Sequence, residues 1–270
     1  MKTNYHTHTY RCKHCLGSDE KMVQAAISSG TDIMGFSDHN PWGFYPDDYD
    51  SRVRMEKCYF PEYLKSFRRL RDKYKDQIEL HIGVEAEYYP HHMDWLRDFA
   101  EEQQLEYVIF GNHFPEPAPG GLPETFYYGN DSALPEHVEQ YTESLIKGIE
   151  TDFYSCIAHP DLFMRSYPRF DETCRKASHA ICKTAEKHNA ILEYNLSGFW
   201  YAAEHQKEFC FPYPEFWQIA SGYKIRAIIG YDAHNHLMLR EDARYREAEQ
   251  YLKSLGIPVV KELPLMRTMK

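Results

Sequence analysis

Short polar sequences rich in histidine follow one apolar, β-type run after another along this chain. The carboxyl ends of parallel strands meet at one rim of a barrel, so residues far apart in sequence can build one site there. The potential metal ligands at these predicted strand ends are His6, His8, His14, His39, Glu85, His113, His159, Asp232 and His234. Imidazoles with carboxylates suit Zn, Fe or Mn better than Ca or Mg. Because nine candidates exceed the needs of one tetrahedral ion, we expect a multinuclear centre.

Strand and helix alternate along the chain. Strands are predicted at 2–7, 32–37, 78–85, 107–111, 154–158, 190–195 and 225–230. Helices are predicted at 19–30, 61–75, 90–103, 135–150, 171–188 and 240–255, with a short one ending at 222. Long loops are expected at 115–135, which is rich in Pro and Gly, and at 198–214, which is aromatic. Buried-type strands alternating with helices predict a parallel α/β sheet, closed or nearly closed into a TIM-like barrel. An open doubly wound sheet is the alternative.

Composition limits the classes of protein that this chain can belong to. Its 270 residues fit one domain over 1–270, and 43% hydrophobic residues are enough for a core. A net charge of −10 argues against a nucleic-acid binder, which needs a basic surface. No apolar stretch approaches the ~20 residues of a membrane span, and no signal-peptide segment precedes the first strand. The seven scattered cysteines suggest reduced thiols and a cytoplasmic protein.

Two pairs of candidate ligands have the same spacing. His6 and His8 are two residues apart in a predicted strand, so both imidazoles point to one side and can chelate one ion. Asp232 and His234 repeat this spacing with one oxygen and one nitrogen ligand. For His6 and His8 the alternative is a polar strand end that faces water.

The ligands after the first two strands compete with neighbouring residues. His14 lies between Cys12 and Cys15 in "CKHC", but a structural zinc site needs four ligands and no second pair of cysteines has this spacing. We therefore favour His14 over the thiols. In "SDHN", adjacent strand residues face opposite ways, so we expect His39 to be the ligand and Asp38 to orient a neighbouring imidazole.

Glu85 can bridge two ions through its two oxygens, and Glu87, which points the same way, is its main competitor. His113 in "GNHF" and His159 in "AHPD" each end an apolar strand. Taken singly, each could be a satisfied polar residue at a strand end. No nucleophile elbow, phosphate-binding loop or dinucleotide fingerprint occurs in the chain. A metal-activated water is therefore the best available nucleophile.

Four polar residues beside these ligands are candidates for substrate binding. Arg165 and Ser166 lie just past His159, and a guanidinium fork beside a metal centre suits a phosphate. A surface salt bridge is the alternative for Arg165. Asn195 ends the one strand that carries no candidate ligand, and Asn40 ends the second strand. We expect both amides to form hydrogen bonds with a substrate.

The motifs resemble those of the PHP (polymerase and histidinol phosphatase) family: "HTHT", "SDH", the glutamate ending the third strand, "NH", "HPD" and "DAH". The resemblance extends from residue 5 to residue 236 and implies a distorted (β/α)7 barrel with three divalent transition-metal ions. It implies one ion on His6, His8, Glu85 and Asp232, a second on Glu85, His113 and His159, and a third on His14, His39 and His234.

Within the family, the chain length, "HTHTYRCKHC" and "RSY" after "HPD" resemble the histidinol-phosphate phosphatases. The resemblance implies hydrolysis of L-histidinol phosphate to L-histidinol and inorganic phosphate in histidine biosynthesis. Arg165 and the ions would bind the phosphate, and Asp232 or His234 would protonate the leaving oxygen. The candidates for binding the cationic end of the substrate are Glu116, Glu193, Phe114, Tyr88 and Trp42.

Two other functions stay open from the sequence. Some members of the PHP family act as nucleases or phosphoesterases on nucleotides or oligonucleotides. A metal-binding regulatory domain without catalysis is the other rival. The sequence leaves the oligomeric state open.

Overall fold

The computed structural model describes residues 1–208 and 210–266. Within these residues a parallel sheet of seven strands has its strands in chain order from β1 to β7. The strands are β1 (Thr3–Asn4), β2 (Ile33–His39), β3 (Glu79–Ala86), β4 (Tyr107–Phe110), β5 (Cys156–Ile157), β6 (Ile191–Asn195) and β7 (Arg226–Gly230). β1 and β5 are only two residues long, so the sheet is unevenly built.

The two edge strands of this sheet meet. Just past the ends of β1 and β7, His8 N donates to Ala233 O at 3.0 Å and Ala233 N donates to His6 O at 3.2 Å. The sheet is therefore a nearly closed barrel, and its closure lies at the carboxyl end of the strands. The predicted distorted (β/α)7 barrel is confirmed, and the open doubly wound alternative is wrong.

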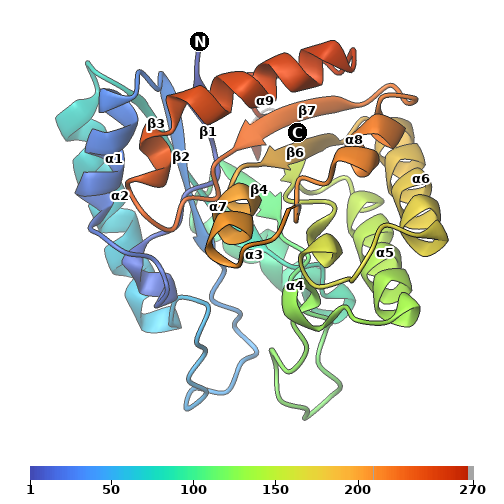
Figure 1. Cartoon of the computed structure of the whole chain (residues 1–270). Coiled ribbons are helices and arrows are strands. Elements are labelled where there is room, and N and C mark those ends of the chain that lie inside the picture. The colour runs from blue at the N-terminus through green and yellow to red at the C-terminus, as the bar shows by residue number, and fades with distance from the viewer. Residues whose placement is uncertain (209, 267–270) are drawn as a thin grey trace.

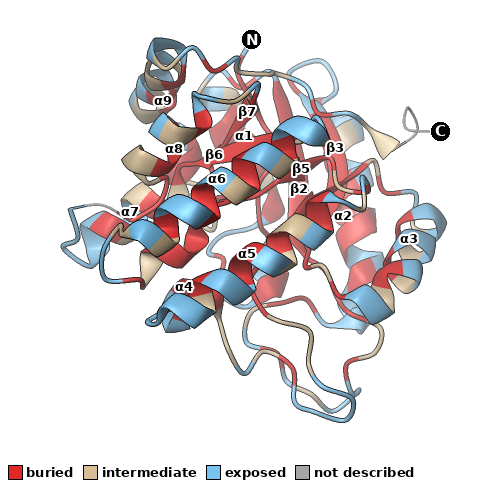
Figure 2. Ribbon diagram, turned by 90° about the vertical axis from the view of Figure 1, so that its right-hand side faces the viewer, coloured by how far each residue is buried: buried red, intermediate tan, exposed pale blue. Residues whose placement is uncertain are grey.

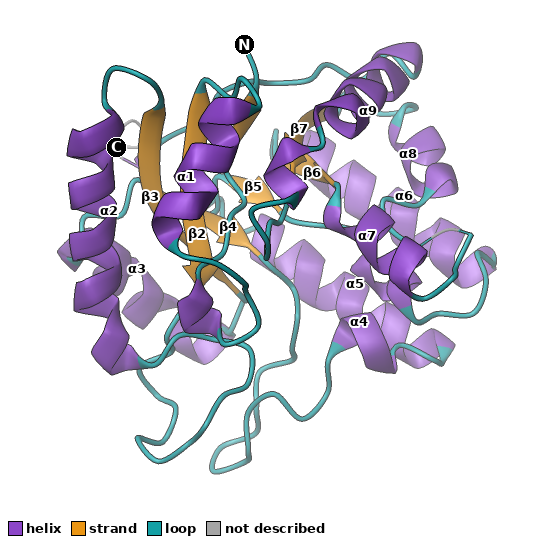
Figure 3. Cartoon of the chain, turned by 60° about the vertical axis from the view of Figure 1, so that its left-hand side comes forward, coloured by secondary structure: helices purple, strands orange, loops and turns teal. Residues whose placement is uncertain are grey.

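The helices surround this sheet (Figures 1 and 3). They are α1 (Asp19–Ser28), α2 (Phe60–Tyr74), α3 (Met93–Glu102), α4 (Tyr128–Asp131), α5 (Pro135–Ile149), α6 (Glu172–Lys187), α7 (Ser197–Glu204), α8 (Pro214–Ala220) and α9 (Asp242–Ser254). Figure 2 shows their buried faces turned toward the strands and their exposed faces toward solvent. Among the described residues, every helix is too short or too polar to cross a lipid bilayer.

Local sequence signals place several of these helices. Ser18 accepts a hydrogen bond from Lys21 N at the start of α1, and Asp171 caps α6 through Thr173 N and Cys174 N. Such caps satisfy backbone donors that have no partner within the helix. Proline stands in the first turn of α2, α5 and α8, where its missing N–H costs nothing.

The two predicted long loops both contain helix. The loop predicted at 115–135 includes the short α4. The prediction of a loop at 198–214 is wrong over its first half, which belongs to α7. Gly198 is a helix-breaking signal in the sequence, but its role here is close packing. A Cβ at Gly198 would lie 1.7 Å from the carbonyl oxygen of Phe211. The glycine therefore lets α7 lie directly against the segment that follows it.

Tyr107 of β4 occupies the inner face of the sheet below the rim. It belongs to a small buried cluster with Ile109, whereas the alternate residues Val108 and Phe110 pack with the main core. Its hydroxyl donates to Tyr5 O at 2.8 Å and to Phe36 O at 2.9 Å. This side chain thus joins three strands across the interior.

Removing the Tyr107 hydroxyl should destabilise the fold. In Tyr107→Phe two buried carbonyls lose a donor, and we expect the free energy of unfolding to fall by about 1–3 kcal/mol in urea denaturation. Tyr59→Phe is the control, because Tyr59 is 49% exposed and its loss of a hydroxyl should change stability by less than about 0.5 kcal/mol. Equal stability of the two variants would contradict this account of the interior.

Candidate metal centre

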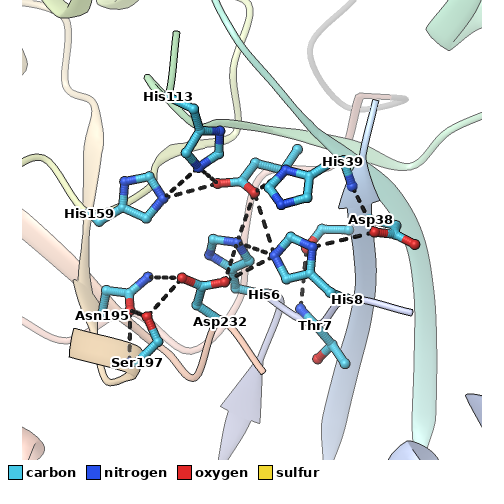
Figure 4. A network of polar contacts seen from close by, with 12 residues as sticks. His6, Thr7, His8, Asp38, His39, His113, His159, Asn195, Ser197 and Asp232 are labelled. Atoms are coloured by element: carbon cyan, nitrogen blue, oxygen red, sulfur yellow. Dashed lines mark hydrogen bonds and ion pairs between the residues drawn. The ribbon is translucent and has the colours of Figure 1, made fainter. Parts of the chain in front are cut away.

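All nine residues predicted as metal ligands lie together at the carboxyl end of the barrel. Figure 4 labels six of them: His6, His8, His39, His113, His159 and Asp232. Their positions follow the strand ends. His6 and His8 follow β1, His39 ends β2, Glu85 lies in β3, His113 follows β4, His159 follows β5, and Asp232 and His234 follow β7, with His14 after the 3-10 turn η1 (Tyr10–Cys12). Segments distributed over more than 220 residues therefore build one cluster.

The carboxylate of Glu85 lies at the centre of the cluster, and its two oxygens face different imidazoles. Oε2 lies 3.2 Å from His39 Nδ1, 3.3 Å from His6 Nε2 and 3.5 Å from His8 Nε2. Oε1 lies 3.1 Å from His159 Nε2 and 3.4 Å from His113 Nε2. One carboxylate thus separates two groups of nitrogens, which is the position of a bridging ligand.

Asp232 and His234 complete the cluster beside His6 and His8, away from His113 and His159. Asp232 Oδ1 lies 3.0 Å from His8 Nε2 and 3.4 Å from His6 Nε2. The His234 ring stacks on His8 with ring centroids 3.9 Å apart, and on His14 at 4.5 Å. Three sets made only of predicted ligands have ligand atoms within 4.8 Å of one another: His6 with His8 and Asp232, His39 with Glu85 and His113, and His8 with His39 and His234. Two further sets include Cys12, one with His14 and His234 and one with His8 and Asp38.

The chemistry of these donors fits divalent transition ions. Glu85 Oε2 and His234 Nε2 are buried and have no hydrogen-bond partner among the described residues. The Nε2 atoms of His6 and His8 are 3.1 Å apart, and those of His113 and His159 are 3.2 Å apart. Two imidazole lone pairs repel each other at this distance unless a proton or a metal ion lies near both. Buried nitrogen and oxygen donors facing each other are what a bound cation would satisfy.

A second layer of acceptors orients the imidazoles by their other nitrogen. The Nδ1 atoms of His6, His8, His113 and His14 face Glu193 at 2.8 Å, Asp38 at 3.4 Å, Glu87 at 3.3 Å and Cys12 O at 2.8 Å, respectively. An acceptor at Nδ1 fixes the ring and leaves Nε2 for a metal. Asp38 thus lies where the sequence analysis expected an orienting residue, whereas Glu193 contacts His6 and lies away from the cavity.

Without a bound ion, imidazoles and carboxylates of the cluster share protons. Burial lowers the pKa of His6 and His8, but the neighbouring carboxylates outweigh it and raise both, so a metal ion would displace their protons. Burial alone raises the pKa of Glu85, but His113 and His6 hold it well below its usual range, and the same holds for Asp232 beside His6 and His8. For His39, burial and then the His8 ring lower the pKa well below its usual value, which keeps this imidazole neutral. Ionised carboxylates and neutral imidazoles are the forms that bind metal ions.

Two of the predicted ligands have unusual backbone angles. His159 has φ of 28° and Asp232 has φ of 47°, in the left-handed region that side chains other than glycine rarely adopt. Each lies two residues past the end of its strand, His159 after β5 and Asp232 after β7, where the chain turns at the cluster. Backbone strain of this kind is held in place by the surrounding structure and concentrates at functional sites.

A cavity of about 630 Å³ opens above the cluster. Arg165, which ends the 3-10 turn η4 (Leu162–Arg165), and Tyr201 and Glu204 of α7 are part of its wall. The Arg165 Nη1 donates to the Tyr127 hydroxyl at 3.1 Å, and its guanidinium carbon lies 3.9 Å from the centroid of the Tyr201 ring. Among the described residues no carboxylate forms an ion pair with Arg165, so the surface salt bridge is absent there. Its charge faces a cavity that could hold an anion.

Asn195 lies beneath the cluster and outside the lining of the cavity. Its Nδ2 donates to Glu193 at 2.7 Å, and its Oδ1 accepts from the Ser197 backbone N–H at 2.9 Å, at the start of α7. The Ser197 hydroxyl lies 2.8 Å from Asp232 Oδ2 and does line the cavity. The contact to substrate that we expected from Asn195 is therefore corrected to a supporting role under Asp232.

Three other predicted substrate-binding residues also lie outside the cavity. The Ser166 hydroxyl accepts from Ser132 N at 3.0 Å, past the end of α4. Glu116 accepts from the backbone and the ring of His91 at 3.0 and 2.7 Å. Asn40 is fully buried. Ser166 and Glu116 therefore bond to nearby residues, and Asn40 is shielded from solvent by burial.

Some cavity residues were not singled out from the sequence. Trp200, Tyr201 and Glu204 belong to α7, which was predicted as loop, so no helical face was considered there. Cys12 is fully buried with its sulfur near ligand atoms of His14 and His234. The "CKHC" motif is the sequence signal that points to Cys12.

Comparison with known families agrees with this site. The description "PHP domain" belongs to the family whose sequence profile matches residues 4–197, which is most of the chain. The chain belongs to the PHP domain family. The predicted family membership is confirmed, and the matched segment contains seven of the nine candidate ligands; Asp232 and His234 lie beyond it.

The alignments with individual relatives are longer than the segment that the family profile matches. The chain is similar to a probable histidinol-phosphatase of Deinococcus radiodurans, with 26% identity over 85% of each chain. A probable histidinol-phosphatase of Schizosaccharomyces pombe is 26% identical over 74% of this chain and 71% of the relative. The histidinol phosphate phosphatase of Lactococcus lactis, solved with zinc, L-histidinol and phosphate, shares the fold, with a TM-score of 0.67, 20% identity and coverage of 96% and 95%.

Neutralising Glu85 should remove metal from the protein. We expect Glu85→Gln to bind at least one transition ion fewer per chain than the wild type, because an amide cannot bridge two cations as a carboxylate does. Elemental analysis of purified protein would measure this. Glu106→Gln is the control, since Glu106 pairs with Arg71 and His81 away from the cluster. Unchanged metal content in Glu85→Gln would contradict a bridging position.

Proposed function

We propose that this PHP-domain protein is a metal-dependent phosphomonoester hydrolase that converts L-histidinol phosphate and water into L-histidinol and phosphate. The observation that carries the proposal is the cavity itself. A buried cluster of imidazoles and carboxylates forms its floor. The guanidinium of Arg165, which has no carboxylate partner among the described residues, faces the cavity from the wall. This arrangement suits a small phosphate ester. We choose histidinol phosphate as the substrate because the similar proteins are named as histidinol phosphatases.

The proposed cofactors are three divalent transition-metal ions of the class Zn, Fe or Mn. We assign His6, His8, Glu85 and Asp232 to one, Glu85, His113 and His159 to a second, and His14, His39 and His234 to the third. When bound, such ions polarise phosphoryl oxygens and lower the pKa of water. Two observations support this assignment: Glu85 Oε2 faces three imidazoles, and the buried His234 Nε2 has no hydrogen-bond partner among the described residues.

Arg165 is the residue we propose for binding the phosphate. Tyr127 and Tyr201 fix the plane of its guanidinium by a hydrogen bond and by stacking, so little side-chain freedom is lost on binding. A preorganised fork of N–H donors can follow the charge that develops on the phosphoryl oxygens during transfer.

Asp232 and His234, the two residues predicted as catalytic, both line the cavity. Burial raises the pKa of Asp232, but His6 and His8 outweigh this and lower it, so its carboxylate is ionised and is a weak base. Burial and then the His8 ring lower the pKa of His234, so this imidazole is neutral. We therefore propose both residues as metal ligands rather than as the proton donor expected from the sequence.

The cationic end of histidinol phosphate, an ammonium and an imidazole, needs acidic and aromatic partners. Glu204 and Trp200 of α7 line the cavity and meet this need, and the predicted Phe114 lines it too. Of the other residues considered, Trp42 is buried and donates to Glu87, and Tyr88 lies outside the lining. We propose that α7 forms the wall that selects the organic part of the substrate.

An oligonucleotide is the rival substrate, and a direct assay separates the two. At equal concentration we expect faster phosphate release from L-histidinol phosphate than from an oligonucleotide with a terminal phosphate, because a chain of net charge −10 repels a long polyanion. Faster turnover of the oligonucleotide would reverse the proposal. A full metal load with no phosphomonoester hydrolysis would favour a regulatory domain.

We also propose that the protein works in the cytoplasm. All seven cysteines lie among the described residues and are unpaired, as a reducing compartment would keep them.

Replacing Arg165 should damage turnover more than metal content. We expect Arg165→Ala to lower kcat/KM for L-histidinol phosphate about 30- to 1000-fold, which corresponds to roughly 2–4 kcal/mol of transition-state binding. Arg165→Lys should recover only part of the loss, because an ammonium cannot form the fork. Arg169→Ala is the control on the same segment, since Arg169 is exposed. Near-normal kcat/KM in Arg165→Ala would show that this residue does not bind the phosphate.

A further inference from the structure

A buried arginine, Arg54, connects the metal centre with two loops that wall the cavity. We propose that Arg54 is a positioning residue: it holds Glu87 against the ligand His113 and at the same time ties these two loops together. The loop pair consists of residues 44–56 and 115–127, which project side by side below the barrel in Figure 1. This inference rests on the proposed metal centre. Arg54 is only 1% exposed, so each of its contacts is shielded from water.

Its guanidinium reaches two segments that carry predicted ligands. Nη2 donates to Glu87 Oε1 at 2.9 Å, and the same oxygen lies 3.3 Å from His113 Nδ1. Nη1 donates to the backbone oxygen of Asn40 at 3.0 Å, next to His39. Arg54 thus reaches the His113 ring through Glu87, and it bonds to the residue that follows His39 in the chain.

The remaining nitrogen connects the loop pair. Arg54 Nε donates to the Glu124 carboxylate, and Glu124 also accepts from the Ser51 hydroxyl at 2.8 Å and the Tyr49 hydroxyl at 3.3 Å. Ser51 and Tyr49 lie on the first loop and Glu124 on the second. Tyr49 and Glu124 line the cavity, so the contact that joins the loops also shapes its wall.

Only a guanidinium can make this set of contacts. Two buried carboxylates flank Arg54, and removing its charge would leave both without a counter-ion, at high cost. A lysine retains the charge but presents one ammonium, which cannot donate to Glu87, Glu124 and Asn40 O in three directions. Arg54→Lys should therefore loosen the contacts while largely retaining the electrostatic balance.

The other end of β3 provides a matched control. There Arg71 Nη2 donates to Glu106 Oε2 at 2.5 Å, and the same oxygen lies 3.1 Å from His81 Nδ1. Arginine, glutamate and histidine are arranged in the same order, but His81 is outside the candidate ligands and no member lines the cavity. A purely structural arginine should behave like Arg71.

The test compares Arg54→Lys with Arg71→Lys in the full chain. In Arg54→Lys we expect metal affinity, measured by competition with a chromophoric zinc chelator, to fall about 10- to 100-fold. Amide hydrogen exchange over 44–56 and 115–127 should accelerate in the metal-free protein, and KM for L-histidinol phosphate should rise more than kcat falls. Arg71→Lys should lower thermal stability and leave zinc affinity, loop exchange and KM at wild-type values.

Two further variants separate the two halves of the proposal and serve if Arg54→Lys does not fold. Glu87→Gln should weaken zinc binding, because an amide is a poorer acceptor for His113 Nδ1. Glu124→Gln should accelerate loop exchange and raise KM with a smaller effect on zinc. Wild-type zinc affinity in both Arg54→Lys and Glu87→Gln, or unchanged loop exchange in Glu124→Gln, would overturn the inference. A wild-type protein that binds no zinc, iron or manganese would instead refute the proposed function.

Discussion

Two backbone hydrogen bonds between His8, His6 and Ala233 join the first strand of this barrel to the last. Every candidate ligand depends on that closure. The pair after β1 and the pair after β7 are separated by more than 220 residues, and they become neighbours only because the sheet returns on itself. The strands between them then need only to end at the same rim of the barrel for their ligands to join the cluster. A parallel barrel does this automatically, because each strand delivers its carboxyl end to one rim.

The positions of the ligands could be predicted because they depend on strand periodicity and chain order alone. His6 and His8 share a side by their spacing of two, and His113 and His159 lie where apolar runs stop. The surrounding layer could not be predicted in the same way. Whether a carboxylate such as Glu193 faces the cavity or supports an imidazole is decided by a residue on another strand.

The same physical reason explains the errors in the expected substrate contacts. Asn195 has the right place in its strand, but its amide is taken by Glu193 and by the start of α7. Glu116 is close in sequence to His113 and yet bonds to His91. Helix α7 could not be predicted because Gly198 is read as a helix breaker, and its close packing against Phe211 is known only from the structure. Polar side chains in short loops choose partners that only the assembled chain supplies.

The left-handed backbone at His159 and Asp232 restricts how this centre could be redesigned. Asn, Asp and His tolerate that conformation several-fold better than other residues with side chains. An exchange of ligand type at either position is therefore practical only within this small set and excludes a glutamate or cysteine without a backbone change. His39, at the end of the regular strand β2, has no such backbone restriction, so a change of ligand type is more practical there than at these two turns.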